Sequence, residues 1–284
     1  MSQPELIASY WTLAGGALPH TDKEYSTFEF KTRIEHAAKA GFKGIGLWHS
    51  DLIHVMQTRS LQEMRQILDA NGMKYVEIEF LADFFLEPGQ RRADSDATRR
   101  LLFDAAEALG GRHIKVGDFF RTEVAMPKLI EEFAQLCKEA RERGTKIAYE
   151  MMPFSKINTL ENALELVQGA GAKNGGIIFD LWHMVKLGIP YEKVWQFPKE
   201  YFFGIEINDG YIRNLPTQDL VEETTQYRRL CGQGEFDVKG FTSMMPKSHY
   251  SGPVGIEVLS KDLRPWPLEK AARTAYETTA AQFT

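Results

Sequence analysis

The chain has 284 residues, of which 43% are hydrophobic, so it can bury the core of one large domain. Its formal net charge of −5 gives no electrostatic footprint for nucleic acid, and no apolar run approaches the ~18 residues that a membrane-spanning helix needs. The first residues also lack the basic and apolar regions of a signal peptide, so we expect a cytoplasmic protein with no membrane or nucleic-acid partner.

Apolar, strand-like segments alternate with helical patterns along the chain. Eight strands are expected, at 6–11, 42–48, 74–81, 112–117, 146–153, 175–182, 201–208 and 252–259. A helical segment follows each of them, at 28–40, 60–70, 92–109, 124–143, 159–170, 191–197, 238–245 and 267–281. Ser60 and Glu63 add a capping box at the start of the second helix. Residues 209–234 are expected to form a long loop after the seventh strand.

Strands that alternate with helices predict a parallel sheet. A closed (β/α)8 barrel needs about 250 residues, so a single α/β domain, a TIM barrel that spans residues 1–284, is favoured. The alternative is an open, doubly wound sheet. No Gly-x-Gly-x-x-Gly follows a strand and no P-loop motif occurs, which argues against dinucleotide or P-loop nucleotide binding.

The last four strands share one feature, a single acid near the C-terminal end. These acids are Glu150, Asp180, Glu206 and Glu257. Parallel barrel strands are nearly all apolar, and barrel enzymes keep their active sites at the C-terminal ends of the strands. Four carboxylates that meet there would repel one another unless a cation or protons balance them, and oxygen ligands suit Mg²⁺ or Mn²⁺. We therefore expect the four acids to hold a metal ion; for any one of them, the alternative is a salt bridge to a loop Lys or Arg.

Residues near these acids are candidates for contact with a substrate. His183 lies three residues after the acid of the sixth strand, so it is expected above the same mouth, where it either assists proton transfer or packs on Trp182. Asn208 lies on the same strand face as Glu206 and could bind a substrate hydroxyl. Lys115, on the fourth strand, could face the mouth and polarise a carbonyl, or point to the surface.

Other candidates for substrate binding stand at strand ends and in the long loop. Trp48 and His49 close the second strand, and Trp182 closes the sixth. The tryptophans could stack on a substrate ring, or they could be ordinary packing residues. Arg229 precedes a Gly-x-Gly turn in the long loop, where it either brings a cation over the mouth or remains a solvated surface residue.

Five short motifs contain most of these residues. In chain order they are Tyr149-Glu150-Met151-Met152-Pro153, Phe179-Asp180-Leu181-Trp182-His183, Ile205-Glu206-Ile207-Asn208-Asp209, the stretch from Arg229 to Gly234, and Gly255-Ile256-Glu257-Val258. In this order they resemble the xylose isomerase-like barrel superfamily, which includes sugar phosphate isomerases and epimerases and the AP endonuclease 2 family. The resemblance covers the second half of the chain and reaches the first half only through its rhythm of strands and helices.

The resemblance implies roles for individual residues. Glu150, Asp180 and Glu257 would be metal ligands. The two glutamates among them would also move protons at the substrate, and His183 would touch it. The position of Glu206 is commonly histidine in the family, so a glutamate there implies either a fourth carboxylate ligand with a harder ion, or a site with three protein ligands. Mn²⁺ or Mg²⁺ is the expected ion, with Co²⁺ or Zn²⁺ as alternatives.

The implied reaction removes a proton from a carbon beside a carbonyl, through an enediolate that the metal stabilises. We expect a metal-dependent sugar isomerase or epimerase that acts on a small-molecule carbohydrate. The first alternative is a lyase, either a dehydratase or a deglycosidase-like enzyme for a keto-sugar or cyclitol. A DNA-repair nuclease would need more strand-end histidines and a basic face. The last alternative is a non-catalytic barrel that binds a sugar. The resemblance also implies a possible homo-oligomer, because the family often pairs barrels.

Overall fold

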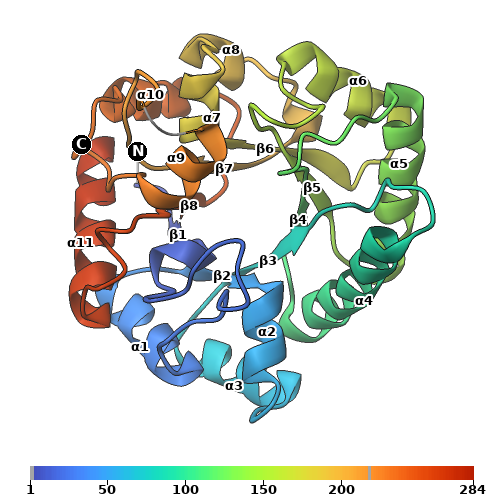
Figure 1. The fold of residues 1–284 in the computed structure, drawn as a ribbon. Coiled ribbons are helices and arrows are strands. Elements are labelled where there is room, and N and C mark those ends of the chain that lie inside the picture. The colour runs from blue at the N-terminus through green and yellow to red at the C-terminus, as the bar shows by residue number, and fades with distance from the viewer. Residues whose placement is uncertain (1–2, 217–218) are drawn as a thin grey trace.

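The computed structural model describes residues 3–216 and 219–284. Within them, eight parallel strands pair with their neighbours in chain order, and β1 also pairs with β8, which closes the sheet into a barrel. Helices surround the barrel, and Figure 1 looks down its axis. The strands are β1 (Leu6–Ala8), β2 (Gly44–Trp48), β3 (Tyr75–Leu81), β4 (His113–Val116), β5 (Ile147–Glu150), β6 (Gly175–Asp180), β7 (Phe202–Ile207) and β8 (Val254–Ile256).

The α-helices of the described residues fall into two groups. Those that cover the outside of the barrel are α1 (Phe30–Ala40), α3 (Leu61–Ala70), α4 (Gln90–Leu109), α5 (Met126–Glu142), α6 (Leu160–Ala170), α8 (Tyr191–Trp195), α10 (Val238–Met244) and α11 (Leu268–Ala280). The shorter ones follow strand ends and are α2 (His49–Val55), α7 (Leu181–Lys186) and α9 (Leu220–Gln226). The 3₁₀ helices are η1 (Tyr10–Thr12), η2 (Lys199–Tyr201), η3 (Met245–Lys247) and η4 (Ala281–Phe283).

The closed barrel confirms the predicted (β/α)8 architecture. The open-sheet alternative is wrong, because β1 and β8 are hydrogen-bonded neighbours. All eight expected strand–helix pairs are present, and the capping box of Ser60 and Glu63 opens α3 as predicted.

The structure differs from the expectation where the chain turns directly after a strand. The predicted sixth strand extends to Trp182, whereas the observed strand ends at Asp180 and α7 begins at Leu181. The Asp180 carboxylate is the physical reason, because it accepts hydrogen bonds from the N–H groups of Trp182 and His183 and so caps the helix. The helices α2 and α9 are also unexpected, and α9 occupies part of the segment predicted as a loop.

The packing of the barrel holds the strand ends in place. Its strands are buried almost throughout, as a parallel sheet covered by helices requires. The helices complete the core with apolar faces; Leu129, Phe133 and Leu136 on one face of α5 are fully buried, and each such side chain contributes about 1.5–3 kcal/mol. None of the helices in the described part of the chain combines the length and the apolar character that crossing a bilayer requires.

Candidate functional site

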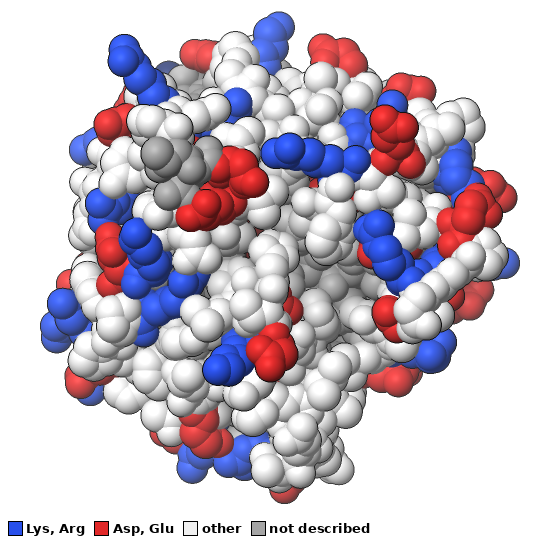
Figure 2. Space-filling view, in the orientation of Figure 1, with Lys and Arg blue, Asp and Glu red and all other residues white. Residues whose placement is uncertain are grey.

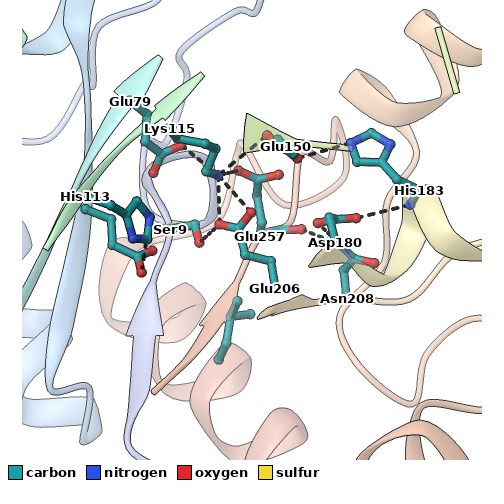
Figure 3. A network of polar contacts seen from close by, with 12 residues as sticks. Ser9, Glu79, His113, Lys115, Glu150, Asp180, His183, Glu206, Asn208 and Glu257 are labelled. Atoms are coloured by element: carbon teal, nitrogen blue, oxygen red, sulfur yellow. Dashed lines mark hydrogen bonds and ion pairs between the residues drawn. The ribbon is translucent and has the colours of Figure 1, made fainter. Parts of the chain in front are cut away.

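The four predicted acids meet at the C-terminal end of the barrel (Figure 3). Glu150 ends β5, Asp180 ends β6, Glu206 belongs to β7 and Glu257 directly follows β8. All four residues are buried, and one carboxylate oxygen of each lies within 4.8 Å of those of the others. Four adjacent strands therefore bring their acids to one point.

Two cations of the protein lie among these carboxylates. Lys115 of β4 reaches into the cluster, and its Nζ lies 2.8 Å from both oxygens of Glu206 and 3.0 Å from Glu257 Oε1. Arg228 Nη1 donates to Asp180 Oδ2 at 2.8 Å and to Glu257 Oε2 at 3.0 Å. Both cations are buried, so water screens these contacts only weakly.

A fifth acid, Glu79 of β3, completes the cluster. Its side chain is 1% exposed, and its Oε2 lies 3.2 Å from Lys115 Nζ, the cation that it faces. A side chain at Gly46 would collide with this carboxylate, so the glycine leaves room for it. Burial raises the pKa of Glu79 to about 7, although Lys115 opposes the shift. Five carboxylates thus surround two cations, and a surplus of negative charge remains when all of them are ionised.

A pocket opens above this cluster at the mouth of the barrel. The polar part of its lining includes Glu79, Glu150, Glu257, His183 and Arg228. Aromatic side chains also line it, among them Trp11, Trp48, Phe80 and Phe119. Figure 2 shows that this face is hollowed near its centre and that mostly uncharged residues surround the hollow. An aromatic wall beside polar groups suits a small molecule with an apolar face and several hydroxyls.

Glu150 and His183 are in contact at this pocket. His183 Nε2 lies 3.2 Å from Glu150 Oε1, and their side chains are 1% and 3% exposed. Burial raises the pKa of Glu150 to about 8; Lys115 opposes that shift and Glu257 adds to it. Burial lowers the pKa of His183 to about 3, so the imidazole is neutral near pH 7. Glu150 can therefore take up and release a proton near neutral pH.

The remaining carboxylates differ in their charge. Burial, followed by the charge of Glu257, raises the pKa of Glu206 well above its ordinary value. Burial acts against ionisation of Glu257 as well, but Lys115 and Arg228 outweigh it and lower the pKa of this residue. A buried cluster of carboxylate oxygens is chemically suited to a hard cation, whose charge would favour the ionised forms of these acids, so the carboxylates could hold a divalent metal ion.

Three residues predicted to bind substrate do not line the pocket. Lys115 is 0% exposed and contacts the carboxylates instead. Asn208 is fully buried and donates to Asp180 Oδ2 at 2.8 Å, so it orients that carboxylate. Trp182 is fully buried against His183, with ring centroids 5.2 Å apart. In the structure these three side chains support the groups around the pocket.

The other strand-end candidates lie nearer the mouth. Trp48 lines the pocket, and its Nε1 donates a hydrogen bond to Glu24 Oε2 at 3.0 Å. His49 lines a neighbouring depression, and its Nε2 lies 4.0 Å from the same Glu24 oxygen. Glu24 lines both hollows, and nothing in the sequence marks it, because it lies in an irregular loop. Glu79 could not be singled out either, because Glu77 stands two residues earlier on the same face of β3.

The two neighbouring arginines of the loop after β7 lie in different places. Arg229, the arginine predicted to bind substrate, pairs with Asp262 at 3.1 Å and donates to the Tyr211 hydroxyl, and it is not among the described residues that line the pocket. Arg228 points into the cluster instead. The sequence indicates an arginine at this place but not which neighbour turns inward, because the loop has no regular period.

A family model described as a xylose isomerase-like TIM barrel matches residues 34–281, which is most of the chain. The chain belongs to this family. In this xylose isomerase-like barrel, the matched range contains the five carboxylates of the cluster and also Lys115 and Arg228.

Relatives of this xylose isomerase-like protein carry two kinds of activity in their names. It is 28% identical to a 3-dehydroshikimate dehydratase of Pseudomonas aeruginosa over 238 residues, which are 83% of this chain and 37% of that protein. It is also 28% identical to an inosose isomerase of Bacillus velezensis over 261 residues, which are 88% of this chain and 91% of that protein. The chain therefore spans little more than a third of the dehydratase but almost the whole isomerase.

Solved structures share the barrel of this xylose isomerase-like protein. The IOLI protein with a binding zinc atom superposes with a TM-score of 0.79 at 20% identity, over 98% of both chains. A D-psicose 3-epimerase with D-tagatose from Clostridium cellulolyticum H10 superposes with a TM-score of 0.73 at 15% identity, over 98% of this chain and 99% of that one. At these identities the likeness shows the fold alone.

Proposed function

We propose that this protein is a sugar isomerase or epimerase that removes a proton from the carbon beside the carbonyl of a neutral keto-sugar or keto-cyclitol. Its cofactor is a divalent ion, Mn²⁺ or Mg²⁺. The observation that carries the proposal is the position of Glu150 and Glu257 at one pocket, within a carboxylate cluster that could hold such an ion. The name of an inosose isomerase among the relatives agrees with this class of reaction.

Glu150 and Glu257 are suited to different steps of the proton transfer. Glu257 contacts Lys115 and Arg228, which keep it ionised, so it is suited to remove the proton. Glu150 lines the same pocket, and its Oε1 lies 3.2 Å from His183 Nε2, so it is suited to return a proton. When bound, a divalent ion supplies positive charge that stabilises the enediolate. Return of the proton to the same carbon gives the epimer, and return to the neighbouring carbon gives the isomer.

The charges around the pocket support a neutral substrate. Among the described residues that line it, Arg228 is the only Lys or Arg. Its guanidinium already donates to Asp180, Glu257 and Thr224, and apart from two histidines the other acidic or basic residues of the lining are glutamates. A carboxylate or phosphate on the substrate would meet no free side-chain cation, whereas hydroxyl groups can donate to the acids.

A dehydratase is the second candidate, because the chain aligns with a 3-dehydroshikimate dehydratase over 83% of its length. Elimination begins with the same proton removal and ends with loss of a hydroxyl group from the next carbon. Glu150 lines the pocket, and a proton passed from it to this hydroxyl would let the hydroxyl leave as water.

Solvent exchange distinguishes the two candidates. The protein, supplied in turn with Mn²⁺, Mg²⁺, Co²⁺ and Zn²⁺, would be incubated with inososes and ketoses in D₂O, and the products analysed by mass spectrometry and NMR. Isomerisation or epimerisation incorporates deuterium with the mass otherwise conserved, whereas dehydration loses water. Glu150→Gln and Glu257→Gln should each slow the reaction by roughly 10²–10⁴. Glu161→Gln, on the exposed surface of α6, is the matched control and should keep the wild-type rate. Neither exchange nor water loss with any of the ions would contradict the proposal.

A further inference from the structure

A depression adjoins the pocket at the mouth of the barrel. Its volume is about 490 Å³, whereas the pocket directly above the acids has a volume of about 30 Å³. The two hollows share a wall, and the residues that line both are His20, Glu24, Trp48, Phe80 and Phe119. Because the pocket is narrow, a ligand whose reacting carbon reaches the acids must extend into the depression.

Aromatic side chains form a continuous row from the pocket into the depression. The rings of Trp48 and Phe80 are stacked with centroids 6.0 Å apart, and the ring of Phe119 lies 4.6 Å from that of Phe80. The imidazole of His20 lies 5.8 Å from Phe119 and 6.4 Å from Phe120. Phe120 lines the depression but is not among the described residues that line the pocket, and it is 55% exposed. The row therefore ends in an exposed ring that offers an apolar face to a ligand.

The polar groups of the depression suit hydroxyl groups and disfavour an anion. Among the described residues that line it, Arg91 is the only Lys or Arg, and the acids are Asp22, Glu24, Asp83 and Asp94. Arg91 is already held by Asp83, whose two carboxylate oxygens accept hydrogen bonds from its guanidinium at 2.9 and 2.6 Å. Asp22 and Asp94 are exposed, so their carboxylates can accept hydrogen bonds from the hydroxyls of a ligand.

Glu24 holds the boundary between the two hollows in place. Its Oε1 accepts a hydrogen bond from the backbone N–H of His20 at 2.7 Å. Its Oε2 accepts from Trp48 Nε1 at 3.0 Å and from Ser50 Oγ at 3.2 Å, and its backbone carbonyl accepts from the Tyr10 hydroxyl at 2.7 Å. These contacts tie the loop that carries Glu24 to the end of β2, so the shared wall is formed before a ligand arrives.

We propose that the depression binds a second sugar ring, so that the substrate is a ketose or keto-cyclitol that carries a neutral glycosyl group. The C–H face of this second ring packs on the aromatic row near Phe120, and its hydroxyls donate to the exposed acids. The reacting carbon of the first ring enters the pocket above Glu150 and Glu257. This inference rests on the proposed function, and it names the substrate class of the same site.

Paired sugars test the size of the substrate. The protein, loaded with the divalent ion that supports exchange, would be incubated in D₂O with D-fructose and with two of its glycosylated forms, lactulose and isomaltulose. We expect kcat/KM for deuterium incorporation to be at least about tenfold higher for one of the disaccharides than for D-fructose, because the second ring adds a stacked contact. With an inosose as substrate, galactinol, in which inositol carries a galactosyl ring, should inhibit at least about tenfold more strongly than myo-inositol.

Variants of the depression locate the second ring. Thr98 of α4 lines the depression but is not among the described residues that line the pocket, so Thr98→Trp should fill the depression and abolish the preference for the glycosylated sugar. Phe120→Ala should reduce this preference at least about threefold, mainly through KM, whereas Phe120→Trp keeps an aromatic face and should retain most of it. Ala97→Trp, on the exposed side of the same helix, is the matched control and should keep the wild-type preference.

The two possible failures are distinct. A protein that exchanges D-fructose or an inosose without preferring the glycosylated member of either pair, or that keeps its preference in Thr98→Trp, would overturn the site for a second ring and leave the proposed function intact. A protein that exchanges neither ketoses nor inososes with any divalent ion would overturn the proposed function, and the substrate assignment would fall with it.

Discussion

Arg228 and Arg229 are neighbours in the chain, but their side chains lie in different surroundings. Arg228 is 2% exposed and bridges Asp180 and Glu257, whereas Arg229 pairs with Asp262 at the surface. Removal of one partner from a buried ion pair leaves the other charge uncompensated, while an exposed pair contributes little. The two arginines are therefore a matched pair for an experiment.

We expect Arg228→Gln to lower the free energy of unfolding by about 3–5 kcal/mol, because Asp180 and Glu257 lose the cation that they share. Arg229→Gln should change it by less than about 1 kcal/mol. Urea unfolding followed by circular dichroism, with divalent ions removed by a chelator, measures both values. Equal effects of the two changes would contradict the inward position of Arg228.

At the scale of the elements, α9 lies over the mouth of the barrel beside α7 (Figure 1). Thr224 and Thr225 of α9 line the pocket, and Glu223 of the same helix forms an ion pair with Lys186 of α7. Both side chains of this pair are 1% exposed. One buried contact thus connects the helix that covers the mouth with the helix that carries His183.

Lys186→Met should loosen α9, because it removes the buried cation beside Glu223. Hydrogen exchange read by mass spectrometry should show the amides of residues 220–226 exchanging at least about tenfold faster, with the barrel strands unchanged. Lys193→Met, on the exposed side of α8, is the control and should leave exchange at wild-type rates. Unchanged protection of α9 in the Lys186 variant would contradict the anchoring role of the ion pair.

At the scale of the whole molecule, a buried histidine at the start of β4 links folding to pH. His113 is 1% exposed, and its Nε2 lies 3.7 Å from Glu77 Oε1, an oxygen that also accepts a hydrogen bond from Arg112. Burial, followed by the charges of Arg112 and Lys115, holds the pKa of His113 well below its ordinary value. The folded protein therefore keeps this imidazole neutral.

The contribution of His113 to stability should consequently fall in acid, whereas Glu79, Glu150 and Glu206, whose pKa values burial raises, contribute in the opposite direction. Above about pH 6.5, His113 is unprotonated in both the folded and the unfolded state. Below that pH, the unfolded chain binds a proton at this residue and the folded protein does not. The His113 contribution therefore lowers the free energy of unfolding by up to about 1.4 kcal/mol per pH unit. Urea unfolding at several values between about pH 7.5 and 5.5 measures this slope, and His113→Gln should reduce it by about one proton's contribution. His49 and His183, whose pKa values burial also lowers, supply further slope. A variant with the wild-type slope would show that His113 is not the group responsible.

The sequence was informative where a regular period governs the chain. Parallel strands that each end in one acid must bring these acids to one end of a barrel, and the structure places Glu150, Asp180, Glu206 and Glu257 together there. The sequence was uninformative in irregular segments such as those that hold Glu24 and Arg228, because no period there relates a position to a direction. The helix α7 was not predicted from the sequence either. Asp180 belongs to the carboxylate cluster and also caps α7, and only the first of these two roles was expected.

By itself, the sequence determined the alternation of strands and helices, the barrel that this alternation forms, and the acids at the ends of its last four strands. These features follow from local patterns and from the direction of the chain. Only the tertiary structure decided which charges compensate one another: Lys115 and Glu206 are 91 residues apart in the chain, and Asp180 and Arg228 are 48 apart. Such pairs depend on how far each side chain reaches across the barrel, and no local pattern carries that information.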